Sequence, residues 1–139
     1  MNKEIIYQNI RAQGGRLTKL RQEIVEILVA EDCLVSASKL LERLNKKQLN
    51  PNRSTIFREL LFLTKNQIVL KNNISGTDYY EIPCEHHHHH LICLGCHSIS
   101  KVKLANHLKG QERKIAKQNK FEITSHSLEF YGYCRKCQV

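Results

Sequence analysis

Two closely spaced pairs of cysteines carry the clearest chemistry in the sequence. Cys93 and Cys96 form one C-x2-C pair, and Cys134 and Cys137 form a second pair near the end of the chain. Four thiolates satisfy the tetrahedral coordination that Zn²⁺ prefers, and a two-residue gap lets a tight turn aim both sulfurs of a pair at one ion. All four positions would then be filled, so we predict a structural zinc site with no open position for catalysis.

Two disulfides or two redox-active C-x-x-C motifs are the alternatives for these cysteines. Neither pair lies beside a βαβ pattern, which would be expected of a redox motif. Residues 1–12 form a polar helical pattern instead of the apolar core of a secretion signal. We therefore expect a cytoplasmic, reducing compartment, in which paired cysteines bind metal more often than they form disulfides.

A run of five histidines, residues 86–90, lies just before the first cysteine pair. Side chains alternate between the two faces of a strand, so His88 and His90 would point to one side and His87 and His89 to the other. One run can therefore supply two metal sites, and imidazole suits zinc, iron, nickel or copper. A solvated polar stretch that binds nothing specific is the alternative. Five further side chains are candidate ligands: Glu81, Cys84, His107, His126 and Cys33.

Helical periodicity runs through the first half of the chain, and the pattern then changes to short strands. The expected helices are 3–12, a second from Thr18 to about Ala30, a third capped by Ser36, and a fourth opened by Ser54 or Asn52 and ending near Asn66. Strand candidates 68–70 and 79–82 flank the turn residues 72–76. Helices followed by a hairpin predict a winged helix-turn-helix domain over residues 1–83, with a small helical bundle plus hairpin as the alternative.

The second half of the chain has a period of mostly two. Strands are expected at 86–93, 97–102, 121–126 and 128–133, and a helix with a basic face at 104–119. These elements would form a second, metal-binding domain over residues 84–139, and a unit of that size is marginal without a metal or a partner. The fold class expected for the whole chain is therefore α+β.

Charge and composition narrow the classes of partner and activity. The 139 residues include 22 Lys+Arg and 13 Asp+Glu, a net charge of +9. This excess fits nucleic acid, an anionic membrane surface or an acidic protein. No run approaches ~18 apolar residues, so we expect no membrane span. A zinc hydrolase would need an open coordination site and a placed base, and no nucleophile motif is present, so we expect no enzyme.

The motifs occur together in the order and spacing of one known family. The matching pieces are Arg16-Leu17-Thr18-x-x-Arg21, Val35-Ser36-Ala37, Ser54-Thr55-Ile56-Phe57-Arg58, His86–His90 with Cys93-x-x-Cys96, His126-Ser127-Leu128, and Tyr131-Gly132-Tyr133-Cys134-x-x-Cys137. They resemble the ferric uptake regulator superfamily over nearly the whole chain. The resemblance implies a homodimeric bacterial repressor. Its N-terminal winged helix would bind operator DNA, its C-terminal domain would dimerise, and a metal corepressor between the two would close the dimer onto the DNA.

The resemblance also implies which residues form each site. The structural zinc would take Cys93, Cys96, Cys134 and Cys137. The regulatory metal would take Glu81, His88 and His90, and our candidates for a fourth ligand are Cys84 and Cys33. A further metal site would take His87, His89 and His126, with His107 as an additional candidate. The DNA would be contacted by Arg16, Ser54, Thr55, Phe57 and Arg58. Two of these residues have structural alternatives: Cys33 as a small buried residue, and Phe57 as part of the apolar face of its helix.

Departures from the family pattern bear on the metal. Leu34 stands where the family often has a histidine, Lys101 stands where it has an acidic residue, and the carboxylate expected near the start of the C-terminal helix falls at His107 or Lys109. With fewer carboxylates and more thiols, zinc is favoured over Fe(II). We therefore predict a zinc-uptake regulator, with an Fe(II)-responsive regulator as the first alternative, followed by a nickel or manganese regulator or an unassigned paralogue. A zinc storage or delivery protein is the alternative from another class.

Overall fold

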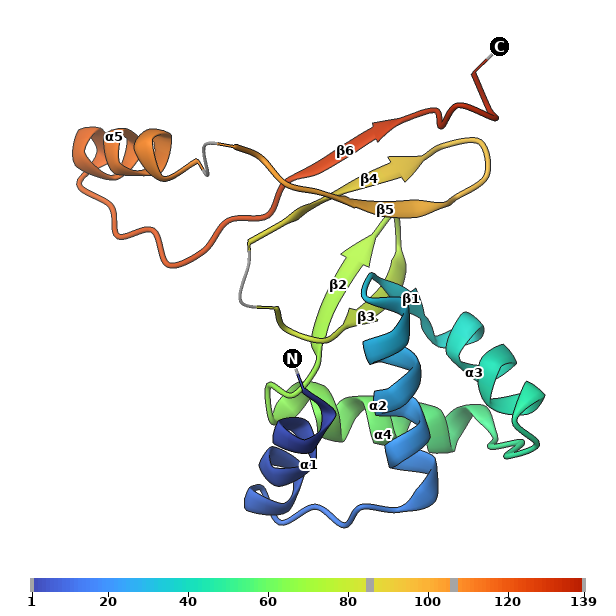
Figure 1. The fold of residues 1–139 in the computed structure, drawn as a ribbon. Helices are drawn as coiled ribbons and strands as arrows, with labels where there is room; N and C mark the ends of the chain where they lie inside the picture. Colours follow the sequence, from blue (N-terminus) through green and yellow to red (C-terminus); the bar gives the residue numbers. More distant parts are fainter. Residues whose placement is uncertain (1, 85–86, 106–107, 139) are drawn as a thin grey trace. The chain divides into compact units, whose positions relative to one another are not determined.

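The computed structural model describes residues 2–84, 87–105 and 108–138. The chain forms two compact units, Met1–Glu85 (unit 1) and His86–Val139 (unit 2), which are coloured blue to green and yellow to red in Figure 1. Each unit combines helix with a small sheet. This confirms the expected α+β class.

Unit 1 consists of four helices and a three-stranded sheet. In chain order these are α1 (Lys3–Ala12), α2 (Lys19–Glu31), β1 (Val35–Ser36), α3 (Ala37–Lys46), α4 (Arg53–Lys65), β2 (Leu70–Ile74) and β3 (Thr77–Glu81). The sheet is antiparallel in the order β1-β3-β2, and β2 and β3 form a hairpin (Figure 1). The hairpin was predicted, but its first strand is shifted: residues 68–69 are not strand, and residues 72–74, expected in the turn, pair with β3. Sequence reasoning missed β1, because a strand of two residues is too short to show a period.

Each of these four helices begins at a polar side chain that accepts a backbone N–H. The capping residues are Asn2, Thr18, Ser36 and Asn52. At the start of α4, Asn52 fills this position instead of Ser54, because its Oδ1 accepts the backbone N–H of Thr55 at 2.8 Å. Such caps satisfy N–H groups that have no partner inside the helix, so they place the helix start within a residue or two.

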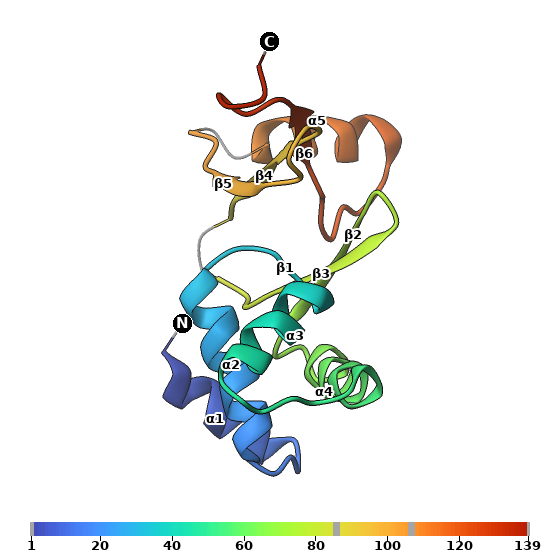
Figure 2. The ribbon, with the colours of Figure 1, turned by 90° about the vertical axis from the view of Figure 1, so that its right-hand side faces the viewer.

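One apolar core holds unit 1 together. The side chains in it that are at most 1% exposed are Ile6, Ile10, Ile24, Val25, Leu28, Val35, Leu40, Leu44, Ile56, Leu60, Leu63 and Val69. Burying a side chain of this size contributes roughly 1.5–3 kcal/mol. Helix α2 packs against both α1 and α3, and α3 packs against α4 (Figure 2). The packing of α4 on α3 therefore helps to set the orientation of α4 within unit 1.

A carboxylate with two cationic partners stabilises the turn between α2 and α3. Glu31, the last residue of α2, accepts a hydrogen bond from Lys39 Nζ at 2.9 Å and pairs with Arg43, both on α3. The hydrogen bond from Lys39 lowers the pKa of Glu31 below its usual 4.5, and burial opposes this in part. A lowered folded-state pKa stabilises the fold above the unfolded-state pKa. That stabilisation is lost as the pH falls through the folded-state value.

We expect Glu31→Gln to destabilise unit 1 by about 1 kcal/mol or less at pH 7, because both cationic partners are nearly half exposed. The difference from the unaltered protein should shrink as the pH falls below 4.5 and through the lowered pKa of Glu31, where the folded-state carboxylate becomes protonated. Urea unfolding at a series of pH values measures this difference in the free energy of unfolding. Glu42→Gln is the control, because its partner Lys46 lies on the same helix and joins no other element. A difference that stays constant with pH would contradict the assignment.

Unit 2 consists of one helix and a second three-stranded sheet. Its elements are β4 (His89–Cys93), β5 (Ile99–Val102), α5 (Lys109–Asn119) and β6 (Glu129–Gly132). Strand β4 is central, with β5 antiparallel on one edge and β6 parallel on the other (Figure 1). Helix α5 buries none of its residues. The buried side chains among the described residues of this unit are His89, His90, Ile92 and Cys93, so its apolar core is very small.

Two expectations for unit 2 are wrong. Residues 121–126 form no strand, although their pattern alternates. The outer edges of this sheet belong to β5 and β6, and residues 121–126 pair with neither of them. The segment instead ends at His126, whose ring contacts His87. The helix expected from residue 104 begins at Lys109, since residues 103–105 are non-helical and Leu108, at the start of the helix, provides no side-chain cap.

Candidate metal centres and nucleic-acid interface

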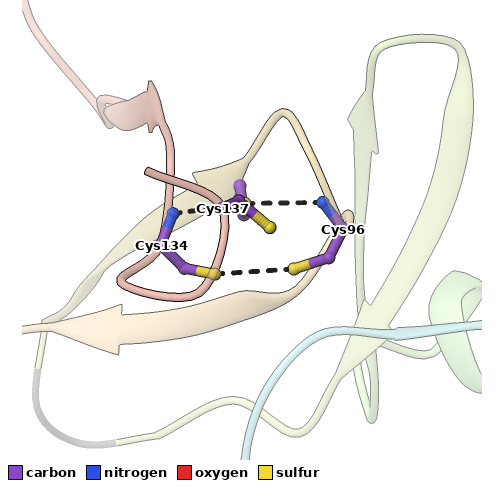
Figure 3. A group of neighbouring side chains, drawn as sticks. Cys96, Cys134 and Cys137 are labelled. Carbon is purple, nitrogen blue, oxygen red and sulfur yellow. Dashed lines mark hydrogen bonds between the residues drawn. The ribbon is translucent and has the colours of Figure 1, made fainter. Parts of the chain in front are cut away.

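The four paired cysteines converge at one end of the unit 2 sheet and form what we call the cysteine clamp. Cys93 ends β4, Cys96 follows it in a turn, and Cys134 and Cys137 lie beyond β6. All four are free thiols whose sulfurs lie within 4.8 Å of one another. The Sγ atoms of Cys96 and Cys134 are 3.7 Å apart (Figure 3). Two thiolates on one tetrahedral zinc would be about 3.8 Å apart, whereas a disulfide needs about 2.05 Å. The clamp therefore fits zinc.

The electrostatics of the clamp also fit a cation. The backbone N–H groups of Cys134 and Cys96 donate to Cys93 Sγ at 3.2 and 3.5 Å. These hydrogen bonds, that from Cys134 first, lower the pKa of Cys93 to about 6. The neighbouring sulfurs, that of Cys134 foremost, raise the pKa of Cys137 to about 12, because a further negative charge among them is unfavourable. A divalent cation removes this conflict, since it binds all four side chains as thiolates.

The parallel pairing of β4 with β6 brings the two halves of the clamp together. Cys93 lies opposite Gly132 in the register, and the backbone N–H of Leu94 donates to the Gly132 carbonyl oxygen at 2.7 Å. Gly95 permits the close approach of the second turn, because a Cβ at this position would lie 2.9 Å from the Cβ of Cys137. Because Gly95 has no side chain, Cys137 can occupy the space beside it.

Three histidines of unit 2 form a second group, the imidazole cluster of His87, His89 and His126. One nitrogen of each lies within 4.8 Å of the others, and the Nε2 atoms of His87 and His126 are 2.6 Å apart. His89 is 2% exposed, and burial lowers its pKa. Its Nε2 is buried without a hydrogen-bond partner among the described residues, an unfavourable state that a bound metal would relieve. The cluster therefore fits a divalent metal with imidazole ligands.

The three ligands expected for the regulatory metal are divided between the two units. His88 and His90 lie together in unit 2, with ring centroids 4.9 Å apart, whereas His87 and His89 belong to the imidazole cluster. Glu81 ends β3 in unit 1, where Asn72 Nδ2 donates to its carboxylate at 3.4 Å. The assignment of these three residues to one metal stays a prediction.

Two further candidate ligands, Cys33 and Cys84, lie in unit 1. Cys33 is half-buried and follows α2, and Cys84 is exposed near the end of unit 1, in a small hollow that Asp32 and Pro83 also line. Among the described residues of unit 1, neither cysteine belongs to a group of three or more possible ligands. Their roles stay predictions. His107 lies outside the described residues.

The exposed side of α4 carries most of the residues predicted to contact DNA. Ser54 and Arg58 are exposed, and Phe57 leaves 53% of its surface open. Phe57 also lines a small hollow with Ile56 and Leu41, so its role in DNA contact stays a prediction beside its place on the apolar face of the helix. Thr55 is half-buried, and its N–H and hydroxyl groups both donate to Asn52 Oδ1 at 2.8 Å. An aromatic ring and a guanidinium thus project from a helix whose first turn is firmly capped.

A residue to which sequence reasoning gave no role, Arg21, ties the loop of Arg16 to α4. Arg21 donates to the carboxylate of Glu59 at 2.6 and 3.2 Å, and its Nη1 donates to the carbonyl oxygen of Arg16 at 2.9 Å. Its guanidinium lies 4.0 Å from the centre of the Phe62 ring. Gly15 leaves room for this packing, since a Cβ there would lie 2.5 Å from Phe62 Cζ. The backbone of Arg16 is thereby tied through Arg21 to Glu59 of α4, and the residue itself is exposed.

Glu112 on α5 is a second residue that sequence reasoning missed. Its Oε1 contacts Nδ1 of His126, the member of the imidazole cluster that comes from the segment before β6. No sequence signal pointed to it, because a polar helix without a buried face has no period that orients it.

None of the helices that the structure describes has the length and apolar character needed to span a membrane.

Comparison with known proteins places the chain in a family. The sequence matches the Ferric uptake regulator family over residues 12–131. The chain belongs to this family. Ferric uptake regulators are metal-responsive, DNA-binding transcription regulators and not enzymes. This member is 32% identical to the ferric uptake regulation protein of Escherichia coli (strain K12) over 127 residues, which cover 90% of this chain and 85% of that protein.

Solved structures of ferric uptake regulators share the fold of this chain. The Helicobacter pylori ferric uptake regulator, described as having three functional metal binding sites, gives a TM-score of 0.82 at 26% identity, covering 98% of this chain and 91% of that one. A zinc-bound manganese uptake regulator gives 0.77 at 25% identity, covering 93% and 98%. The fold expected from the resemblance is confirmed, and the family includes proteins named for different metals. Membership alone therefore does not identify the metal that this regulator senses.

Proposed function

We propose that this protein is a homodimeric bacterial repressor of the cytoplasm that binds operator DNA when zinc fills its regulatory site and so controls metal-uptake genes. One observation carries the proposal. The exposed surface of α4 can contact DNA, and the candidate metal ligands come from both units, because some precede and others follow the unit boundary in the sequence. A metal that binds ligands from both units would couple metal concentration to DNA affinity.

The DNA-binding step uses the exposed groups of unit 1. The ring of Phe57 can pack on a thymine methyl in the major groove, and Arg58 can bind a phosphate. Arg16, positioned by Arg21, suits a narrow A·T-rich minor groove. A two-fold symmetric dimer implies a palindromic operator. The net charge of +9 implies an affinity that falls steeply with salt.

The metal-sensing step uses ligands from both units. The proposed ligands are Glu81, His88 and His90, with Cys84 or Cys33 as the fourth. One ion bound by all of them would limit the motion of unit 1 against unit 2. Because the ion binds the DNA-competent arrangement more tightly, it shifts the protein toward that arrangement. Imidazole and thiol donors favour zinc over Fe(II), which is the reason for proposing a zinc-uptake regulator.

Fluorescence anisotropy with an A·T-rich palindromic duplex tests this function. Protein that keeps only its clamp zinc is titrated with the duplex without added metal, with Zn²⁺, and anaerobically with Fe²⁺ or Mn²⁺. We expect zinc to tighten binding by about 10- to 100-fold, within the usual range of allosteric coupling. Equal binding with and without metal would overturn the corepressor role. If Fe²⁺ tightens DNA binding more than Zn²⁺ does, the protein is still a metal-dependent repressor, but its regulatory metal is iron and not zinc.

Two variants separate DNA contact from metal sensing in the same assay. Arg58→Ala should weaken DNA binding in the presence of zinc without changing the zinc content. His88→Ala should remove the response to zinc. Lys117→Ala is the control for loss of one positive charge, since Lys117 is an exposed residue of α5. For a zinc storage protein, Arg58→Ala would change neither the zinc content nor the affinity for the duplex.

A further inference from the structure

The imidazole cluster has a carboxylate behind one of its rings. Glu112 lies in the first turn of α5, and its Oε1 contacts Nδ1 of His126. The two side chains are 25% and 21% exposed, so solvent reaches this pair only in part. On the other side of the ring, Nε2 of His126 faces Nε2 of His87. The two nitrogens of His126 therefore have different surroundings.

These surroundings determine which nitrogen carries the proton. A carboxylate accepts hydrogen bonds and does not donate them, so it favours the proton of the neutral His126 ring on Nδ1. The lone pair then lies on Nε2, which points toward the cluster. A carboxylate behind a metal-bound imidazole also makes the ring a stronger donor and holds its orientation.

The second ring of the cluster has the same arrangement with a different partner. His89 forms a backbone hydrogen bond with Leu128. Its Nε2 has no hydrogen-bond partner among the described residues, so Nδ1 makes that bond. Both His89 and His126 are therefore held at Nδ1, and their Nε2 atoms are left for a ligand. The short segment from His126 to Leu128 contributes to both arrangements.

We propose that Glu112 is the positioning residue of this cluster and acts through His126 to build a site of three neutral imidazoles for a borderline divalent cation such as Zn²⁺. This goes beyond the proposed function, whose metal is assigned to Glu81, His88 and His90 and not to the cluster. The carboxylate expected near the start of the helix is replaced by His107 or Lys109. Glu112 lies further along the same helix, and there it contacts a ring instead of joining the three nitrogens.

The role of Glu112 is tested first without added metal. In ¹⁵N-histidine NMR of full-length protein with its clamp zinc, His126 should carry its proton on Nδ1. Glu112→Gln should keep this tautomer, because the amide oxygen still accepts a hydrogen bond, and Glu112→Ala should shift it toward Nε2. Glu122→Ala is the control, since Glu122 is an exposed carboxylate of the same unit. An unchanged tautomer in Glu112→Ala would overturn the proposal.

Zinc affinity then measures the consequence for the site. Zinc is titrated against a chromophoric chelator in a His88→Ala background, so that the proposed regulatory site does not compete. Glu112→Ala should weaken the second zinc by about 10- to 100-fold, Glu112→Gln by clearly less, and Glu122→Ala not at all. Equal losses for Gln and Ala would show that Glu112 binds the metal directly and would overturn the positioning role. Absence of a second zinc in the background protein would overturn the site itself, whereas the DNA assay above reports separately on the repressor.

Discussion

Cys93→Ser is expected to release the structural zinc and unfold unit 2 while unit 1 stays folded. Unit 2 buries few side chains and its helix buries none, so its folding free energy comes largely from the clamp. Structural zinc contributes on the order of 10–16 kcal/mol in small zinc-binding peptides, which is comparable with the whole stability of a typical domain. Cys93 is the most buried of the four ligands and accepts hydrogen bonds from both turns.

Metal analysis together with ¹H–¹⁵N NMR measures this outcome. The variant should lose clamp zinc, and signals of unit 2 should collapse toward random-coil positions while those of the unit 1 core stay dispersed. Cys33→Ser is the matched control, because it removes a thiol outside the clamp and should keep both the zinc and the unit 2 spectrum. A folded, zinc-free unit 2 in Cys93→Ser would show that the metal is not structural.

Arg21→Ala is expected to destabilise unit 1 by about 3 kcal/mol, because it leaves the carboxylate of Glu59 without its partner in a largely buried position. Three further contacts of the guanidinium would be lost with it. These are the stacking on Phe62, the hydrogen bond to the Arg16 carbonyl oxygen and the packing against Gly15. We also expect weaker DNA binding at temperatures where the variant is folded, because the loop of Arg16 is no longer held against α4.

Urea unfolding of a double-mutant cycle separates the charge effect from packing. Arg21→Met combined with Glu59→Leu should recover most of the lost stability, because no buried charge is left unpaired. The exposed pair of Lys46 and Glu42 provides the comparison, and Lys46→Ala should change the unfolding midpoint much less. If the double variant is as unstable as Arg21→Ala, the loss comes from packing and the ion-pair explanation fails.

Short-range signals in the sequence were sufficient for the helices of unit 1 and for the identity of the clamp ligands. Side chains such as Thr18 and Ser36 cap their own helices, so this information is local. The spacing of Cys93 and Cys96 suits a turn wherever the second pair comes from. The alternating histidine pattern likewise predicted that His87 and His89 share one face and that His88 lies with His90 on the other, and the family resemblance added His126 to the first pair.

Long-range pairing was decided only by the tertiary structure. Residues 121–126 alternate like a strand, but they pair with neither of the edge strands β5 and β6. The contacts of Arg21 with Glu59 and of Glu112 with His126 join residues that no local period relates. Caps and turns depend on residues that are close in the sequence, so consecutive residues are enough to predict them. Strand partners and buried polar contacts depend on which surfaces remain available once the chain has packed. The sequence alone therefore determined the helices of unit 1 and the ligand types, and the fold determined the strand pairing and which ligands meet.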